Sequence, residues 1–246
     1  MSNNKKPTKK EKYEMKKKEK MEAKEKKLKT EKIKRIGMWI GLTVVIIGSL
    51  IVMVNLASNE PEGGGNATPQ QVNAEDWTKG GEQASVEILE YADFQCPACA
   101  DAKPALERLS EDFGDDLKIA LRHFPLEAIH PNAQLASQAA EAAGLQGKFW
   151  EMHDMLFENQ RDWSRERNPE DKFISYAEFL ELDIEKFEAD LKSDAVKDAV
   201  DSDQNAGFKA GVNSTPTFYL NGERIQNLGY EGFKTLIEEE LSKSSE

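Results

Sequence analysis

The sequence predicts an α/β domain preceded by a single N-terminal transmembrane helix. The α/β class follows from the order of its patterns: a β-α-β unit, a long stretch with helical spacing only, a β-hairpin and a final amphipathic helix. The transmembrane helix follows from an uncharged apolar segment near the N-terminus. These patterns together predict one membrane anchor followed by one globular domain.

The apolar segment, residues 36–57, begins IGMWIGLTVVIIGSL and is long enough to cross a bilayer as a helix. Residues 1–35 hold 16 Lys and Arg against 6 Glu, an excess typical of the cytoplasmic side of a membrane. We therefore expect a basic cytoplasmic tail, an uncleaved single-pass anchor in a bacterial cell membrane, and an extracytoplasmic domain. A cleaved signal peptide is the alternative, but its apolar region is shorter, and Asn55 and Ala57 fit a cleavage site poorly.

The segments on either side of the span lack the composition of a folded core. The tail interleaves Lys with Glu and has no series of aromatic side chains for base stacking, so no nucleic-acid partner is expected. Residues 58–76 are rich in Gly, Pro, Asn and Gln, which predicts a flexible linker. Residues 77–246 have the length of one globular domain.

The domain begins with the β-α-β unit. Val86–Tyr91 reads as a buried strand and Leu117–Phe124 as a second strand. Apolar residues recur at helical spacing over 99–113, and Gly114 can end that helix. Helical patterns then fill residues 132–208, before a hairpin around Asn221-Gly222, which suits a type I′ turn, and a last helix over 230–241.

The only two cysteines form the motif Cys96-Pro97-Ala98-Cys99, between the first strand and its helix. This spacing is typical of a thiol-disulfide active site, for which we expect no cofactor. A structural disulfide is a weaker interpretation, because so short a loop removes little entropy from the unfolded chain. A structural zinc site needs four ligands, and no metal is expected because the histidines stand at no ligand spacing: His123, His130 and His153.

The segment VEILEYADFQCPAC, residues 86–99, resembles the active-site segment of the DsbA-like thiol:disulfide oxidoreductases, including membrane-anchored members from Gram-positive bacteria. Pro104, RHFPL at 122–126 followed by HPNA at 130–133, and GVNSTPTFYLNG at 211–222 agree with it. The resemblance covers nearly all of residues 77–241. It implies a thioredoxin fold with a helical insertion at about residues 131–209.

The resemblance also implies roles for the motif residues. Cys96 would be the exposed nucleophile, at a helix start that lowers its pKa, and Cys99 the more buried resolving thiol. Thr215-Pro216 resembles the cis-proline loop that faces the active-site disulfide and pairs with a bound peptide. An ordinary trans proline at a strand start is the alternative.

Three further residues would support the site. Glu90 lies in an apolar strand, so we expect a buried carboxyl with a raised pKa, and the family's buried acid implies a proton relay to Cys99. A solvated glutamate at a sheet edge is the alternative. Pro97 and Ala98 separate the cysteines, and Ala98 departs from the histidine of strongly oxidising DsbA proteins, which predicts a weaker oxidant.

We therefore expect a membrane-anchored extracytoplasmic thiol-disulfide oxidoreductase that introduces disulfides into exported proteins through Cys96 and Cys99. Its partners would be exported proteins with thiols or disulfides, a membrane redox partner that resets the active site, and the lipid bilayer around residues 36–57. A disulfide reductase or isomerase is an open alternative, and so is a redox-inactive peptide-binding or chaperone module.

Overall fold

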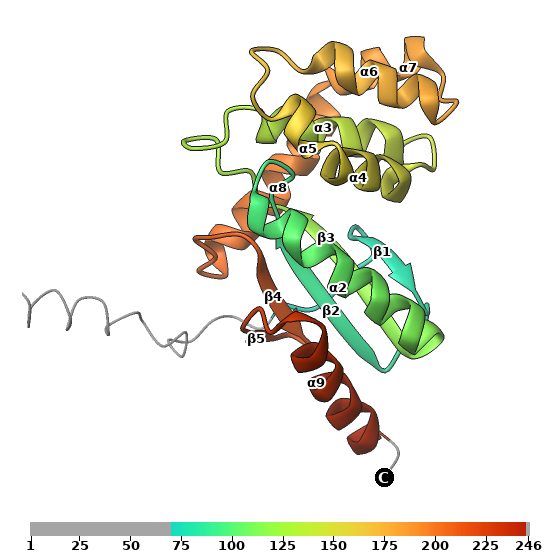
Figure 1. Cartoon of the computed structure of the whole chain (residues 1–246), viewed down its shortest axis with the longest axis vertical. Helices are drawn as coiled ribbons and strands as arrows, with labels where there is room; N and C mark the ends of the chain where they lie inside the picture. The colour runs from blue at the N-terminus through green and yellow to red at the C-terminus, as the bar shows by residue number, and fades with distance from the viewer. Residues whose placement is uncertain (1–69, 245–246) are drawn as a thin grey trace, which may run out of the picture. The chain divides into compact units, whose positions relative to one another are not determined.

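A five-stranded mixed sheet forms the centre of the computed structural model, which describes residues 70–244 (Figure 1). The strand order is β1-β3-β2-β4-β5. The central pair, β2 and β3, is parallel, and the other neighbouring strands are antiparallel. The strands are β1 (Trp77–Gly80), β2 (Val86–Ala92), β3 (Leu117–His123), β4 (Thr217–Leu220) and β5 (Glu223–Ile225).

Helix α2 (Pro97–Phe113) connects β2 to β3 and confirms the predicted β-α-β unit. It lies on the same face of the sheet as α9 (Gly229–Ser244), and their apolar residues form one core with that face, including Ile88, Leu106 and Phe233. As predicted, α2 ends at Gly114, whose φ of 50° is unfavourable for other residues. The helix begins at Pro97, between the two cysteines and shortly after β2 ends at Ala92.

The predicted hairpin is confirmed by its backbone. Asn221 and Gly222 both have positive φ, 47° and 89°, as a type I′ turn requires. The Asn221 side chain also accepts a hydrogen bond from the Glu87 N–H at 2.8 Å. The turn is thereby joined to the start of β2.

The helical insertion comprises α3 (Ala133–Gly144), α4 (Phe149–Glu158), α5 (Gln160–Trp163), α6 (Glu170–Phe179), α7 (Ile184–Leu191) and α8 (Asp194–Lys209). These helices cover residues 133–209, and the insertion was expected at about 131–209. Its apolar core is continuous with Phe94, Cys96, Cys99 and Leu121, so it meets the sheet at the cysteine motif. The end of α8 packs on the opposite sheet face from α2, where Phe208 contacts Phe124.

Two features differ from the sequence-based expectation. Strand β1 was not predicted, because its four residues WTKG carry little strand pattern and are ordered by antiparallel pairing with β3. Residues 70–76, expected in the flexible linker, are hydrogen-bonded to the sheet: Gln70 N–H donates to the Gly222 carbonyl, and Asp76 pairs with Arg122. The folded part therefore begins before the boundary expected at Trp77.

Within residues 70–244, no helix combines the length and the apolar character needed to cross a membrane. The predicted tail, the predicted span at 36–57 and most of the predicted linker lie outside the described residues.

Candidate active site

Cys96 lies at the N-cap of α2, immediately before Pro97. Its backbone is extended, with φ of −74° and ψ of 120°, and the backbone N–H groups of Ala98 and Cys99 favour its ionised sulfur. Unpaired N–H groups and the helix dipole stabilise negative charge at this position. Both cysteines are free thiols in this structure.

The two sulfurs have opposite acidities. A hydrogen bond from the Cys99 thiol, together with Thr215 and the two backbone N–H groups, lowers the pKa of Cys96 to about 5, although burial opposes this. Burial, followed by the neighbouring Cys96 and Glu90, raises the pKa of Cys99 well above its usual value. At neutral pH Cys96 is therefore a thiolate and Cys99 a thiol, and the thiolate is the nucleophile in disulfide exchange.

The expectation of an exposed nucleophile needs correction. Cys96 is only 7% exposed, against 1% for Cys99, because the core of the insertion reaches over it. The exposed residues of the motif are Pro97 and Ala98.

Thr215 and Pro216 face the nucleophile from the loop before β4. Their peptide bond is cis, as the resemblance implies. In its protonated form, the Cys96 thiol donates a hydrogen bond to the Thr215 carbonyl oxygen at 3.4 Å. The Thr215 hydroxyl is buried and has no hydrogen-bond partner among residues 70–244, so it is available to the thiolate.

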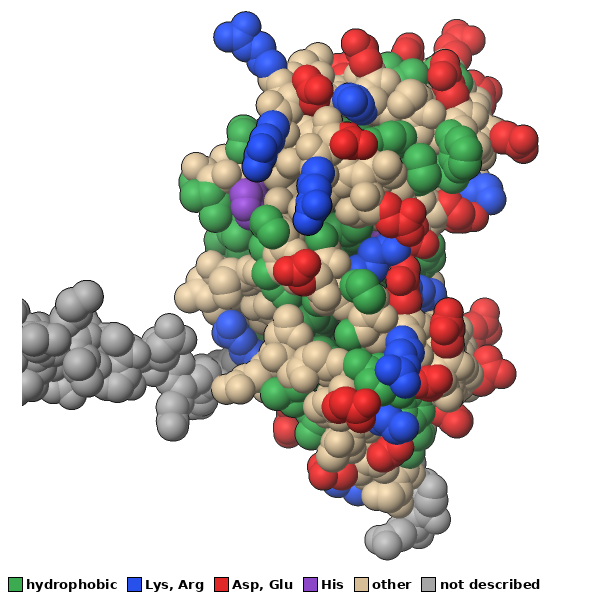
Figure 2. All heavy atoms as spheres, viewed as in Figure 1, with side chains coloured by type: hydrophobic (Ala, Val, Ile, Leu, Met, Phe, Trp, Pro, Cys, Tyr) green, Lys and Arg blue, Asp and Glu red, His purple; other side chains and the backbone are tan. Residues whose placement is uncertain are grey.

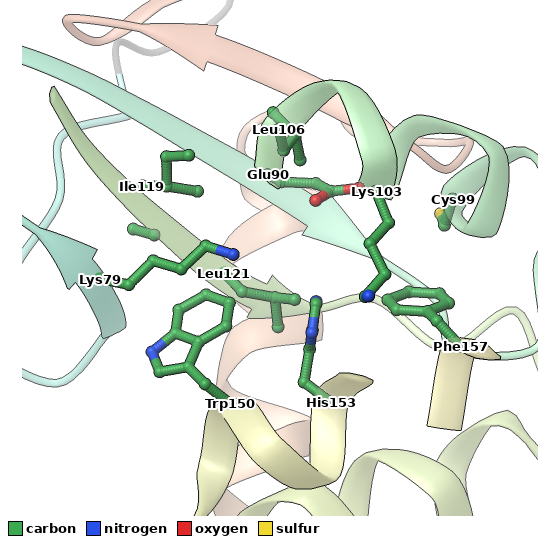
Figure 3. A pocket seen from close by; sticks show the side chains of 11 residues that line it. Lys79, Glu90, Cys99, Lys103, Leu106, Ile119, Leu121, Trp150, His153 and Phe157 are labelled. Atoms are coloured by element: carbon green, nitrogen blue, oxygen red, sulfur yellow. The ribbon is translucent and has the colours of Figure 1, made fainter. Parts of the chain in front are cut away.

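Glu90 lies on β2 and is 4% exposed, so the alternative of a solvated sheet-edge glutamate is wrong. Burial raises its pKa to about 8. Figure 3 shows its carboxyl in a cavity that is also lined by Cys99, Lys79 and His153. Both Cys99 and Glu90 are protonated near neutral pH. The cavity therefore holds the protons that are released or taken up when Cys99 takes part in disulfide exchange.

Lys79 supplies the positive charge that most lowers the pKa of Glu90. Its ammonium lies 4.7 Å from the centre of the Trp150 ring, and burial lowers its pKa. Lys103 lines the same cavity, but it is paired with acidic side chains, including Asp154 at 3.3 Å and Glu158 at 3.2 Å. Sequence reasoning missed Lys79, because it lies on the unpredicted strand β1.

Asp93 organises the turn that precedes Cys96. It is fully buried, and its carboxylate accepts hydrogen bonds from the N–H groups of Gln95 at 2.7 Å and Leu126 at 2.9 Å. His130 Nδ1 lies 2.7 Å from the same carboxylate. The segments RHFPL and HPNA are therefore joined to the active-site turn, and His130 has a structural role there.

A family model described as thioredoxin matches residues 73–239. The chain belongs to this thioredoxin family. Among solved structures, oxidised BdbD from Bacillus subtilis has a TM-score of 0.64 at 24% identity and covers 72% of this chain and 98% of its own. The thiol-disulfide exchange protein alpha-DsbA2 from Wolbachia pipientis has a TM-score of 0.59 at 16% identity and covers 68% and 88%. These matches confirm the predicted resemblance and the thioredoxin fold with its insertion.

The predicted enzyme class, thiol-disulfide oxidoreductase, agrees with the family and with the thiol-disulfide exchange protein among these neighbours. A thioredoxin-like oxidoreductase from Silicibacter pomeroyi is a further structural neighbour, with a TM-score of 0.58 at 20% identity, and covers 68% of this chain and 92% of its own. Among curated relatives, the Na(+)/H(+) antiporter NhaA 1 of Salinispora arenicola is 42% identical over 149 residues. That alignment covers 61% of this chain but only 22% of the relative.

His123 lies beside two acidic side chains that are distant from it in the sequence. Ligand atoms of His123, Glu141 and Asp203, from β3, α3 and α8, lie within 4.8 Å of one another and could hold a metal ion. The three residues are also joined by hydrogen bonds: His123 Nε2 lies 2.9 Å from Glu141 Oε1, and the backbone N–H of His123 donates to Asp203 Oδ2 at 3.0 Å. These hydrogen bonds give His123 a structural role, and the expectation that no metal binds stays a prediction.

Proposed function

We propose that this thioredoxin-family protein oxidises pairs of thiols in exported proteins by passing on its Cys96–Cys99 disulfide. The contrast between the two sulfurs carries the proposal. In the reduced protein Cys96 is stabilised as a thiolate by the start of α2, Thr215 and the Cys99 thiol. Stabilising the reduced form makes the corresponding disulfide a stronger oxidant, which favours oxidation of substrates over their reduction.

The reaction consists of two exchanges. A substrate thiolate attacks Cys96 Sγ, the bond between the two enzyme sulfurs breaks, and Cys99 leaves. A second substrate thiolate then attacks the substrate sulfur of this mixed disulfide, and Cys96 leaves as a thiolate. The substrate has then lost two electrons and gained a disulfide, while the enzyme is reduced and must be reoxidised by a membrane disulfide-generating partner.

Glu90 serves the first exchange as a proton donor to Cys99. The raised pKa of Cys99 makes its thiolate a poor leaving group unless it is protonated as the bond breaks. Glu90, with a pKa of about 8, holds a proton at neutral pH and lines the same cavity as Cys99. The arrangement supports a proton relay between these two side chains.

The sequence supports a place of action outside the cytoplasm. The uncharged segment at 36–57 and the basic residues before it support an anchor with the folded domain outside the cytoplasm. Disulfides form and persist in that compartment. The chain covers only 22–24% of the length of the curated antiporter relatives, so the proposal does not extend to ion transport.

The reduction potential tests the direction of exchange. The full chain is equilibrated with glutathione buffers, and the fractions of dithiol and disulfide are measured. We expect a value between about −270 mV, as for thioredoxin, and about −120 mV, as for DsbA. A value at or below that of thioredoxin would indicate a reductase. In parallel, the oxidised chain should oxidise a reduced, unfolded dithiol protein, whereas Cys96→Ser should not.

A further inference from the structure

The turn that carries Cys96 is held by a side chain of the helical insertion. Gln160, the first residue of α5, donates hydrogen bonds through Nε2 to the carbonyl oxygens of Phe94 at 2.8 Å and Cys96 at 3.0 Å. Phe94 is 1% and Cys96 7% exposed, so these carbonyls are largely removed from water and need a donor. The Cys96 carbonyl also accepts from the Ala100 N–H, at a longer 3.3 Å.

Gln160 is itself held in place. It is 9% exposed and lies three residues before Trp163, which is fully buried and donates through its indole N–H to the Leu156 carbonyl at 2.8 Å. The short helix is thereby tied to the end of α4. The Gln160 amide therefore reaches the active-site turn from a helix that is anchored to α4.

A second amide links the same two segments in the opposite direction. Gln95, in the turn, donates through Nε2 to the Ser164 carbonyl at 2.7 Å and accepts from the Asn132 N–H at 2.7 Å. The turn and the insertion therefore exchange hydrogen bonds both ways. Of these two glutamines, however, only Gln160 is hydrogen-bonded to the carbonyl of the nucleophile itself.

We propose that Gln160 is a positioning residue for the nucleophile: its hydrogen bond to the Cys96 carbonyl sets the N-cap conformation that keeps Sγ against the N–H groups of α2. The physical reason is that ψ of Cys96 relates the direction of its carbonyl to the direction of its side chain. Holding the carbonyl holds the sulfur at the helix start. The inference depends on the exchange site but on neither direction of exchange, so it stands or falls separately from the proposed oxidation of exported proteins.

Gln160→Met tests the proposal, because Met has a similar length and no N–H group. Released from its donor, the Cys96 carbonyl can turn and the sulfur can move away from the helix N–H groups. In the reduced full chain, we expect an ultraviolet titration of the thiolate to show a pKa of Cys96 higher by about one unit, a tenfold change in ionisation. The glutathione-equilibrated potential should become more negative by about 30 mV, which corresponds to that tenfold change.

Gln134→Met is the matched control. Gln134 is also an amide of the insertion and donates across it, to Asp201 at 3.1 Å, but it does not contact the turn before Cys96. This variant should lower thermal stability without moving the thiolate titration or the potential. Gln160→Asn keeps the amide on a shorter side chain and should fall between the parent and Gln160→Met.

Parent values of both the Cys96 pKa and the potential in folded Gln160→Met would overturn the proposal and leave Gln160 with a structural role only. If Gln160→Met does not fold, Gln160→Asn decides in the same way. A shift of equal size in Gln134→Met would also contradict it, since any loosening of the insertion would then have the effect.

Discussion

Ala98 offers the nucleophile a backbone group but no side-chain donor. Its N–H is among the groups that lower the pKa of Cys96, while its exposed methyl group cannot donate a hydrogen bond. The thiolate therefore depends on α2, Thr215 and Cys99. This is the structural basis for expecting an oxidant weaker than relatives with a histidine at this position.

Ala98→His should lower the pKa of Cys96 further, because the imidazole N–H can donate to the thiolate. The reduced form is then stabilised, so the potential should become more oxidising, by about 30 mV for each tenfold change. A thiolate titration and a glutathione-equilibrated potential measure the two effects. Ala98→Leu adds bulk without a donor and should change neither. An unchanged or more reducing potential in Ala98→His would show that residue 98 does not set the potential.

Glu90 should make the stability of the folded protein depend on pH. Its folded pKa of about 8 is above its ordinary value of 4.5, so between these values the folded state retains a proton that the unfolded state has released. The free energy of unfolding therefore falls as pH rises through this window, by up to about 1.4 kcal/mol per pH unit.

Glu90→Gln should remove this contribution, so its advantage in stability over the parent should grow from about pH 5 to about pH 8. Urea denaturation of the disulfide form measures the difference without interference from the thiol of Cys96. Burial raises the pKa of Asp203 to about 6. Its effect on the free energy of unfolding is the same in both proteins, so it cancels in the difference. A pH-independent difference between the two proteins would contradict the raised pKa.

At the scale of elements, the segment before β1 is attached to the sheet through a buried ion pair. Arg122 on β3 donates to Asp76 through Nε at 2.6 Å and Nη2 at 2.9 Å, and both side chains are at most 6% exposed. Arg122 also donates to the Tyr91 hydroxyl on β2 at 3.1 Å. The guanidinium group of Arg122 therefore joins β2 and β3 to the segment that precedes β1.

Asp76→Ala should destabilise the domain by about 3–5 kcal/mol, because it leaves the buried Arg122 charge without its carboxylate. Chemical denaturation measures the loss. The matched control is Glu151→Ala, which removes the carboxylate of a pair with Lys148 whose side chains are 43% and 44% exposed, and it should cost less than about 1 kcal/mol. Equal losses in the two variants would mean that residues 70–76 contribute little to the fold.

At the scale of the whole molecule, the charge is distributed very unevenly along the chain. Residues 1–35 carry a net charge of +10, whereas residues 57–246 hold 17 basic and 39 acidic side chains. On the face shown in Figure 2, acidic side chains are spread over the insertion and the helices below it, with basic side chains scattered between them. This asymmetry supports the proposed topology, since the positive-inside rule depends on the basic residues next to the span.

Protease added to intact protoplasts should therefore digest the folded domain and spare the N-terminal tail. Antibodies or tags at the two ends of the chain can follow the two parts separately, and lysed protoplasts provide the control in which both are digested. Digestion of the tail alone would show the opposite orientation. Resistance of both ends would place the whole chain inside the membrane barrier.

The sequence by itself determined the local features of this protein. Alternation and helical spacing of apolar residues marked β2, α2 and β3, and Asn221-Gly222 marked the hairpin, because each pattern reflects the conformation of the residues that carry it. The spacing of Cys96 and Cys99 after a strand likewise indicated the chemistry. For the pKa values of the two thiols, the sequence predicted only the direction of the difference, because Cys96 was expected at the start of the helix.

The tertiary structure decided what depends on residues distant in the chain. Strand β1 is ordered by its pairing with β3, and this pairing places Lys79 beside Glu90. Gln160 lies 64 residues after Cys96 and holds its carbonyl. The sequence around a glutamine does not show whether its amide will be solvated or buried. The packing of whole elements, rather than the neighbours in sequence, decides which hydrogen bonds a side chain makes.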